Sequence, residues 1–582
     1  MGGPIANVER EVKLDVGLRF ELPDLTGIIP GVVATRLPDA KLQAIYVDTA
    51  DLRLMRWGVT LRHRRDAVGG AGAESGWTIK LPGAADGVAL VRTELSWPGS
   101  FGSVPAEVAS LVRAQARTAR LEPVAKLLTE RHRVELRDSS GRKLGEVDDD
   151  VVSVMDGRRL AARFRQVELE VTDAAPVALL EEAMRALTLA GAIPGDDRPK
   201  VVRAIGPRAS QGPDIVVPTL DSNSTVGRVV SAAIAAGVTR MILHDPGVRL
   251  GDDPEHVHQA RVGTRRLRSD LRTFWRLLDP DWAGPVRTEL GWLADALGEV
   301  RDADVLMGRF RGQIRTLADI DAKAAAALLR RLASQRDDAR ERMLAVLDSE
   351  RYVILLDTLA RGAANPPLAR GDAEVGKNGS AVADRPVADL VSAVVGASRD
   401  EQASNGTSAG SGATDAVVDI APASTPAVVQ PTVADPTAYR SEVGDKLAAD
   451  VLPALVRRPW RHLQQAVESL GDDPPDEALH EVRIRSKRLR YASEAVTGVI
   501  GKPARQLAAA AAGLQGVLGD MQDAVVAEEW LRRQAGSSPP SQALVAGQLV
   551  MLQRQEQAAC RTAWSRPWKV ASDKSLRNWL KG

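Results

Sequence analysis

Residues 258–268, HQARVGTRRLR, return in altered form as HEVRIRSKRLR at residues 480–490. On a helical wheel, the basic residues of each copy fall on one side, and the apolar or small residues lie on a separate arc. A second matched pair follows at nearly the same offset, LGEVRDADVL (297–306) and LGDMQDAVVA (518–527). Two matched segments in the same order indicate a duplicated unit, which we expect to contain about four antiparallel helices per copy.

The basic side of each copy is a candidate anion-binding stripe. Like charges spaced i,i+3 and i,i+4 repel by a few tenths of a kcal/mol per pair, so a stripe without interleaved acids is best explained by a bound anion. A solvated charged face is the simpler alternative. The histidines fit the stripes as hydrogen-bond donors that gain charge below neutral pH. The stripe residues are His258, Arg261, Arg265, Arg268 and Arg272 in the first copy, and His480, Arg483, Lys487 and Arg490 in the second.

Composition narrows the class of anion. Aromatic residues make up 3% of the chain and none lies among the basic positions of the first stripe. Binding of single-stranded nucleic acid needs aromatic stacking platforms, and sequence-specific DNA recognition needs contacts to base edges. A ligand made of phosphate without bases fits better. The formal net charge is only +1, so attraction for anions must come from local clusters.

Other features of composition favour a cytoplasmic, soluble protein without a membrane partner. The single cysteine, Cys560, excludes a disulfide framework and a cysteine-built zinc site. The opening residues, MGGPIANVEREVK, do not have a signal-peptide pattern, and no run of 18 apolar residues occurs.

Up to about residue 205, the sequence alternates with period two, as in VEREVKLDV, WTIKLP and FRQVELEV. This pattern predicts strands with one charged and one apolar face, and helices are expected near 104–117 and 176–190. Either the sheet is open and its charged face meets water, or it closes into a barrel with the charges inside. In a barrel, crowded carboxylates would repel by up to about 4 kcal/mol per pair, and a divalent cation would relieve this. Neighbouring arginines and lysines would attract phosphate.

Residues 5–205 resemble the CYTH domain of the triphosphate tunnel metalloenzymes. EREVK (9–13) carries the family's ExExK motif, and YVDT (46–49), LRHR, TIKLP and VELE follow in the family's order. The resemblance implies an antiparallel barrel that cleaves or binds triphosphates with Mg²⁺ or Mn²⁺. It assigns Glu9, Glu11, Glu168 and Glu170 as metal ligands, and Asp148, with Glu146 nearby, to a second metal or to water. The choice among Asp148, Asp149 and Asp150 stays open. The implied phosphate-binding residues are Lys13, Arg62, Arg64, Lys80, Arg92, Arg131, Arg133 and Lys200.

Residues 219–565 resemble a CHAD domain, a helical family associated with inorganic polyphosphate, and this resemblance implies that the two stripes bind that polymer. We therefore expect an α+β multidomain protein, with an N-terminal barrel and a C-terminal all-α duplicated region. The expected boundaries are 5–205 for the CYTH-like domain, 206–218 for a linker, 219–362 and 437–565 for the helical repeats, 363–436 for a low-complexity, mostly disordered insertion, and 566–582 for a tail.

Together the resemblances imply a metal-dependent hydrolase of inorganic triphosphate, polyphosphate or a related triphosphate, acting by in-line attack of a metal-positioned water. We favour an enzyme because the principal charged positions of the strand domain are all present. The alternatives are a non-catalytic polyphosphate-binding protein, serving granule association or phosphate storage, and an adenylate cyclase or thiamine triphosphatase. Polyphosphate or triphosphate is the expected partner, without sequence-specific nucleic acid.

Overall fold

The computed structural model describes residues 5–66, 75–86, 89–195, 198–369 and 442–581, and it describes side chains from residue 11 on, except for residues 83–92 within the strands. Most of the expected insertion (363–436) lies outside the described residues. The chain divides into two compact units. Unit 1 comprises Met1–Val216, Ile242–His256 and Leu344–Asp357, and unit 2 comprises Val217–Met241, Val257–Met343 and Thr358–Gly582.

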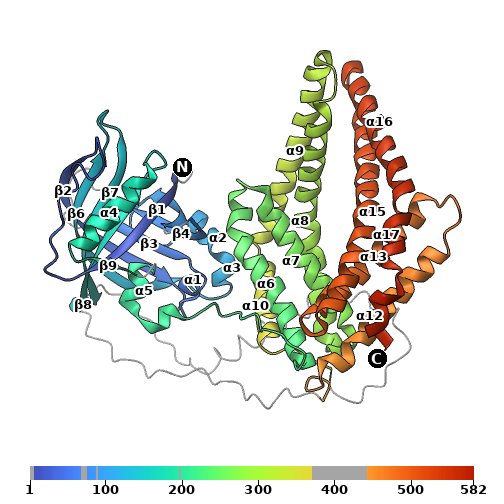
Figure 1. The fold of residues 1–582 in the computed structure, drawn as a ribbon, viewed down its shortest axis with the longest axis horizontal. Coiled ribbons are helices and arrows are strands. Elements are labelled where there is room, and N and C mark those ends of the chain that lie inside the picture. Colours follow the sequence, from blue (N-terminus) through green and yellow to red (C-terminus); the bar gives the residue numbers. More distant parts are fainter. Residues whose placement is uncertain (1–4, 67–74, 87–88, 196–197, 370–441, 582) are drawn as a thin grey trace, which may run out of the picture. The chain divides into compact units, whose positions relative to one another are not determined.

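The strands of unit 1 form a closed antiparallel barrel (Figure 1). The strands are β1 (Ile5–Val16), β2 (Val33–Asp48), β3 (Thr60–Asp66), β4 (Ser75–Asp86), β5 (Ala89–Pro98), β6 (Glu122–Arg137), β7 (Lys143–Asp156), β8 (Arg159–Val171) and β9 (Ile193–Pro194). Their order is β5-β4-β3-β2-β6-β7-β8-β1-β9, and an additional β5–β1 pairing closes the sheet. The open-sheet alternative is therefore wrong.

Two of the hydrophobic clusters of unit 1 lie outside the barrel wall. Leu14, Val147 and Leu169 pack on helix α4 (Val177–Leu189) through Leu179 and Leu187. Residues of β3, β4 and β5 pack in the same way on α2 (Ala106–Leu111) and its continuation α3 (Arg113–Ala116). These helices confirm the two expected near 176–190 and 104–117. Because the apolar face of each strand points outward, the charged face points into the barrel.

An apolar cluster fills one end of the barrel interior. Tyr46 is paired directly opposite Arg62, so both side chains share the interior face of the sheet. Tyr46, Leu127 and Val152 are buried against Val201 of helix α5 (Lys200–Ile205) and against residues of α1 (Arg53–Arg56). The short helix α5 therefore closes this end, and its first residue, Lys200, borders the charged part of the interior.

The helical region contains two successive groups of helices. The first is α6 (Val226–Leu250), α7 (Pro254–Thr273), α8 (Pro280–Ile314), α9 (Ala322–Leu347) and α10 (Glu350–Ala364); the second is α12 (Ala448–Glu468), α13 (Asp476–Ala495), α14 (Thr497–Ile500), α15 (Lys502–Ala535) and α16 (Pro540–Ala563). The expected all-α region is thus confirmed. After α16, α17 (Ser565–Ala571) and a short 3₁₀ segment (Lys574–Lys581) pack on α15 and α12.

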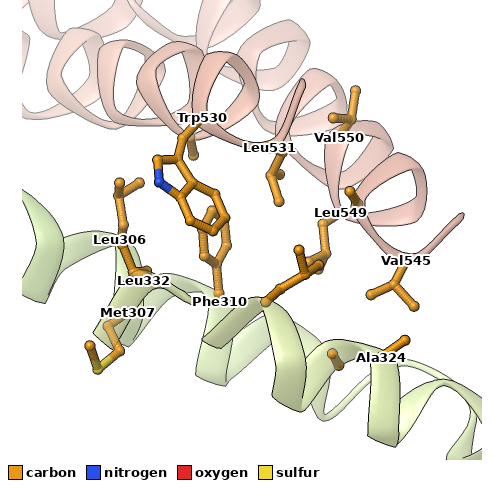
Figure 2. Close-up of a cluster of buried hydrophobic side chains, with 14 of the residues drawn as sticks. Leu306, Met307, Phe310, Ala324, Leu332, Trp530, Leu531, Val545, Leu549 and Val550 are labelled. Carbon is orange, nitrogen blue, oxygen red and sulfur yellow. The ribbon is translucent and has the colours of Figure 1, made fainter. Parts of the chain in front are cut away.

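The two groups of helices share a hydrophobic core. Side chains from α8 and α9 meet side chains from α15 and α16, and Figure 2 shows Phe310 and Trp530 facing each other within this cluster. Their ring centroids lie 5.4 Å apart. The duplicated halves are therefore parts of one folded unit.

Among the described residues, one helix, α6, is long and apolar enough to cross a membrane. However, 56% of its apolar window is buried within the structure, as in a core helix of a soluble protein, so the feature is weak evidence for a membrane span.

Candidate phosphate sites in the barrel and on the helices

The strand register places acidic residues side by side inside the barrel. Glu11 of β1 is directly opposite Glu170 of β8, and Glu170 is directly opposite Glu146 of β7. Glu146 is in turn opposite Glu135 of β6. Like charges in directly opposed positions destabilise a sheet. This row of carboxylates therefore needs cations, from the protein or from a ligand.

Basic side chains supply part of that charge. The Arg131 guanidinium binds both oxygens of Asp150, with N–O distances of 2.8 and 2.7 Å. Lys200 Nζ donates to Asp150 Oδ2 and Glu168 Oε2, each at 2.5 Å. Burial acts to raise the pKa of Glu168, but Lys200, Lys13 and Arg131 hold that pKa well below its ordinary value. Glu168 is thus an anion at neutral pH.

The opposite side of the interior has an excess of cations. Lys80 Nζ lies 3.0 Å from Glu94 Oε2, and Arg62 Nη2 lies 3.7 Å from the same oxygen. The charge of Arg62, together with burial and Arg131, lowers the pKa of Arg64 to about 10. Within the described part of the chain, no carboxylate lies within ion-pair distance of Arg64. An anion placed here would therefore gain several charge-assisted hydrogen bonds.

Two interior carboxyl groups are held at raised pKa. Burial is the main cause for Asp148, whose pKa rises to about 7 although Arg131 opposes the shift; Asp150, Glu146 and Glu168 add to it. Burial also raises the pKa of Glu170. In the described residues, Glu170 has no basic side chain within ion-pair distance. Both carboxyl groups are therefore protonated more readily than free ones, and a bound cation would favour their charged forms.

These residues fit a divalent cation in their chemistry. The available donors are carboxylate oxygens, which Mg²⁺ and other hard cations prefer. Among the described side chains, no three acidic or histidine groups converge as a ready-made ligand set, and the side chain of Glu9 is outside the described ones.

Most of the barrel residues predicted from the sequence share the interior. They are Glu11, Lys13, Arg62, Arg64, Lys80, Arg131, Asp148, Glu168, Glu170 and Lys200. Arg133 pairs with Glu146 at 2.6 Å and is 36% exposed, so it lies near the rim. Glu9 and Arg92 are opposite each other on β1 and β5, but their side chains lie outside the described ones.

The structure narrows the choice among the three aspartates to two. Asp148 and Asp150 point inward, where Arg131 pairs with both. Asp149 points outward and accepts two hydrogen bonds from Arg165, at 2.8 and 2.7 Å. Sequence reasoning kept Asp150 among the open choices and gave Glu94 and Glu135 no site role, although period-two alternation from Arg92 and Arg133 places both glutamates on the charged faces.

The YVDT segment has a structural role in this fold. Asp48 accepts hydrogen bonds from the backbone N–H groups of Leu54 and Met55, at 2.8 and 3.0 Å, and so holds the turn at α1. Burial raises the pKa of Asp48 to about 6 although these backbone donors oppose the shift.

In unit 2, the two basic stripes adjoin. Lys487 of α13 is half-buried, and burial together with Arg265, Arg483, Arg261 and Arg268 lowers its pKa to about 8. Three of these arginines belong to α7, so side chains of both helices surround one lysine. Between the helices, the buried ring of Tyr491 also contacts Arg265. The arrangement is a concentrated field of positive charge.

The remaining stripe residues lie along the same helices. Burial is the main cause that lowers the pKa of Arg272, and the charges of Arg287 and Arg268 lower it further. Arg272 is therefore close to Arg268. Arg490 donates to Glu494 at 2.7 Å. His480 Nδ1 lies 2.6 Å from Gln522 Oε1, so this ring is oriented by α15, and His258 is half-buried on α7.

The second matched segment of each copy, on α8 and α15, lies beside the basic stripe of that copy. A Cβ at Gly298 would lie 3.8 Å from Arg261 Nε, and a Cβ at Gly519 would lie 3.8 Å from Arg483 Nε. The small residue thus lets each guanidinium lie against the neighbouring helix. Asp302 also pairs with Arg261 at 3.1 Å. Sequence reasoning found this repeat but missed its role, because it contains no basic pattern of its own.

Two protein-family matches agree with this architecture. The CHAD domain family matches residues 232–532, and the CYTH domain family matches residues 7–204. Over 552 residues the chain is 31% identical to an uncharacterized protein of Mycobacterium tuberculosis, covering 91% of this chain and 90% of that protein. Among solved structures, PptA from Streptomyces chartreusis is 22% identical, covers 60% of this chain and 100% of its own, and gives a TM-score of 0.39. The CHAD domain from the plant Ricinus communis is 21% identical, covers 62% and 96%, and gives a TM-score of 0.41. The chain belongs to the CHAD family and carries an N-terminal CYTH domain.

Proposed function

We propose that the barrel is a divalent-metal-dependent hydrolase of inorganic triphosphate, polyphosphate or a related triphosphate, and that the helical unit binds polyphosphate. The observation that carries the first part is the composition of the barrel interior. A cationic side around Arg62, Arg64 and Lys80 adjoins an acidic side around Glu11 and Glu170 within one closed sheet. This pairing suits a ligand that is itself a phosphate chain with a metal cation.

In this proposal the basic residues bind the phosphates, and the acidic residues hold the metal or accept a proton. Arg64, Arg62 and Lys80 bind phosphate oxygens and stabilise the negative charge that develops on them during phosphoryl transfer, where catalysis is mainly positioning and electrostatics. Asp148, with a pKa of about 7, accepts a proton from attacking water at its carboxylate. Mg²⁺ or Mn²⁺, held by Glu11, Glu168 and Glu170 with Glu9, supplies Lewis-acid chemistry when bound.

In the helical unit, the adjoining stripes of α7 and α13 form the polyphosphate site. Lys487 and the four arginines around it repel one another, and a polyanion that neutralises them relieves this repulsion. Two stripes also hold a polymer better than one, since the second contact forms within an existing complex. Cytoplasmic retention on polyphosphate granules is the corresponding location.

A non-catalytic polyphosphate-binding protein is the second candidate. It is favoured by the internal ion pairs of the barrel: Lys13 lies 2.9 Å from Glu11, and Lys200 lies 2.5 Å from Glu168. An interior that neutralises part of its own charge needs its ligands less.

Phosphate release separates the two candidates. We would measure it for the full chain with tripolyphosphate, ATP, thiamine triphosphate and long-chain polyphosphate, with Mg²⁺ or Mn²⁺. Glu11→Gln/Glu170→Gln should lose release by at least about a hundredfold if the carboxylates hold the metal. Glu130→Gln, an exposed position on the same barrel, is the matched control and should keep wild-type release. Equal, negligible release by all three proteins with retained polyphosphate would favour the binding protein.

A further inference from the structure

Helix α12 carries a basic hollow away from the two stripes. The hollow, of about 430 Å³, is lined by Ala454, Arg457, Arg458, Arg461, His462 and Gln465. None of these lining residues is acidic. Arg457 donates to the Leu580 carbonyl oxygen at 2.7 Å. Arg458 and Arg461 are exposed, and within the described part of the chain neither has an acidic partner in ion-pair range.

The hollow is connected to α13 by further cations. His462 Nδ1 lies 3.4 Å from Arg485 Nη1, and burial, Arg485, Arg458 and Arg488 lower the pKa of His462. Arg488 Nε is buried without a hydrogen-bond partner among the described residues. Arg485 pairs with Glu481, which offsets only part of this charge. The hollow is therefore one end of a larger basic surface.

That surface continues to the first stripe. Besides burial, the charges of Arg272 and Arg485 lower the pKa of Arg488, which places α7, α13 and the region of the hollow within electrostatic range of one another. Arg272 is itself the last residue of the α7 stripe. A chain of phosphates could thus pass from the stripes across Arg488 and Arg485 to α12 along a mainly basic surface, with Glu481 as an acidic neighbour of Arg485.

Duplication alone does not explain the hollow. The corresponding first helix of the first group, α6, reads VGRVVSAAIAAGVTRMILHDPGVRL, with apolar and small residues over most of its length. By contrast, α12 places Arg457, Arg458, Arg461 and His462 within two helical turns. The second group therefore carries a basic cluster that its counterpart lacks.

We propose that the α12 hollow is a phosphate-binding subsite that holds a more distant part of the same polyphosphate chain that the stripes bind. The inference rests on the proposed polyphosphate binding of the helical unit. The inference predicts that the protein prefers long polyphosphate chains, because a short anion held by the stripes would not reach α12.

The test compares ligand lengths in the full chain. The variant is Arg458→Gln/Arg461→Gln, and the control is Lys323→Gln/Arg330→Gln, which removes the same charge from exposed positions of α9. Binding of long-chain polyphosphate, tripolyphosphate and inorganic phosphate would be measured over a range of salt concentrations. For the variant we expect about tenfold weaker binding of the long chain and a salt slope smaller by about 1 to 2, with tripolyphosphate binding unchanged. The control should match wild type for all three.

The possible outcomes distinguish failure of the α12 subsite from failure of the proposed polyphosphate binding by the stripes. If the variant binds long chains as tightly as wild type does, α12 is not a subsite, but the proposal that the stripes bind polyphosphate is unaffected. If the variant loses tripolyphosphate or inorganic phosphate as strongly as the long chain, α12 belongs to one compact site and the extension is wrong. If wild type retains no polyphosphate, both the α12 subsite and the proposed polyphosphate binding by the stripes are wrong.

Discussion

Replacing Lys487 with Met should make the protein more stable near neutral pH and weaken polyphosphate binding. Methionine keeps the unbranched aliphatic chain and removes the charge. Burial and four arginines lower the pKa of Lys487 from 10.5 to about 8. Below pH 8 both the folded and the unfolded chain carry this proton, and the folded state bears the full repulsion. As pH rises from 8 to 10.5, the unfolded chain binds more protons at this site, so stability increases.

The magnitude follows from that shift. Each pKa unit corresponds to about 1.4 kcal/mol, so the drop from 10.5 to about 8 gives an upper bound of about 3 to 4 kcal/mol. Solvent screening reduces this for a half-buried side chain, and we expect about 1 kcal/mol. A gain in stability that accompanies a loss of binding is typical of residues kept for function.

Urea unfolding of wild type and Lys487→Met, followed by far-UV circular dichroism at neutral pH and near pH 10, would measure the effect. Lys323→Met, at an exposed position of α9, is the control and should change little. The gain should be largest at neutral pH and shrink towards pH 10. A variant that is less stable than wild type at neutral pH, or a gain independent of pH, would refute the idea that the stripes repel.

Three further predictions concern other parts of the molecule. Lys200→Met should destabilise unit 1 by about 2 to 4 kcal/mol, because Asp150, fully buried, and Glu168 both lose a partner; thermal unfolding measures this, and an unchanged midpoint would contradict it. Gly237→Ala should destabilise the helical unit by about 1 to 3 kcal/mol, since its Cβ would lie 2.3 Å from Leu267 Cγ; wild-type stability in urea would argue against this packing. Removal of divalent metal with a chelator should abolish phosphate release but leave long-chain polyphosphate bound to the helical unit, and parallel loss of both in release and retention assays would count against two separate sites.

Much of the fold follows from local pattern. Period-two alternation predicts the strands and the charged face that carries Glu11, Lys13, Glu168 and Glu170, and helical periodicity predicts the stripes on α7 and α13. Closure of the barrel does not follow, because it depends on the pairing of β1 with β5, two strands far apart in the sequence.

Partners supplied by other elements were also beyond sequence reasoning. Lys200 is one residue of a short helix, and nothing in its neighbours shows that it bridges Asp150 and Glu168. Likewise, the basic hollow of α12 has no counterpart in the first copy of the repeat. A comparison of the two copies therefore does not single out Arg458 and Arg461.

The apolar end of the barrel has a consequence for how a polymer would be processed. With Tyr46, Leu127 and Val152 sealed beneath α5, a long chain cannot be threaded through from one opening to the other. If the proposed hydrolysis takes place in this barrel, only the terminus of the chain would enter, and each released product would leave by the same opening before the chain advances. Turnover on long chains should then be governed by repeated withdrawal and re-entry, and the enzyme would shorten many chains slightly before it consumes any one of them completely.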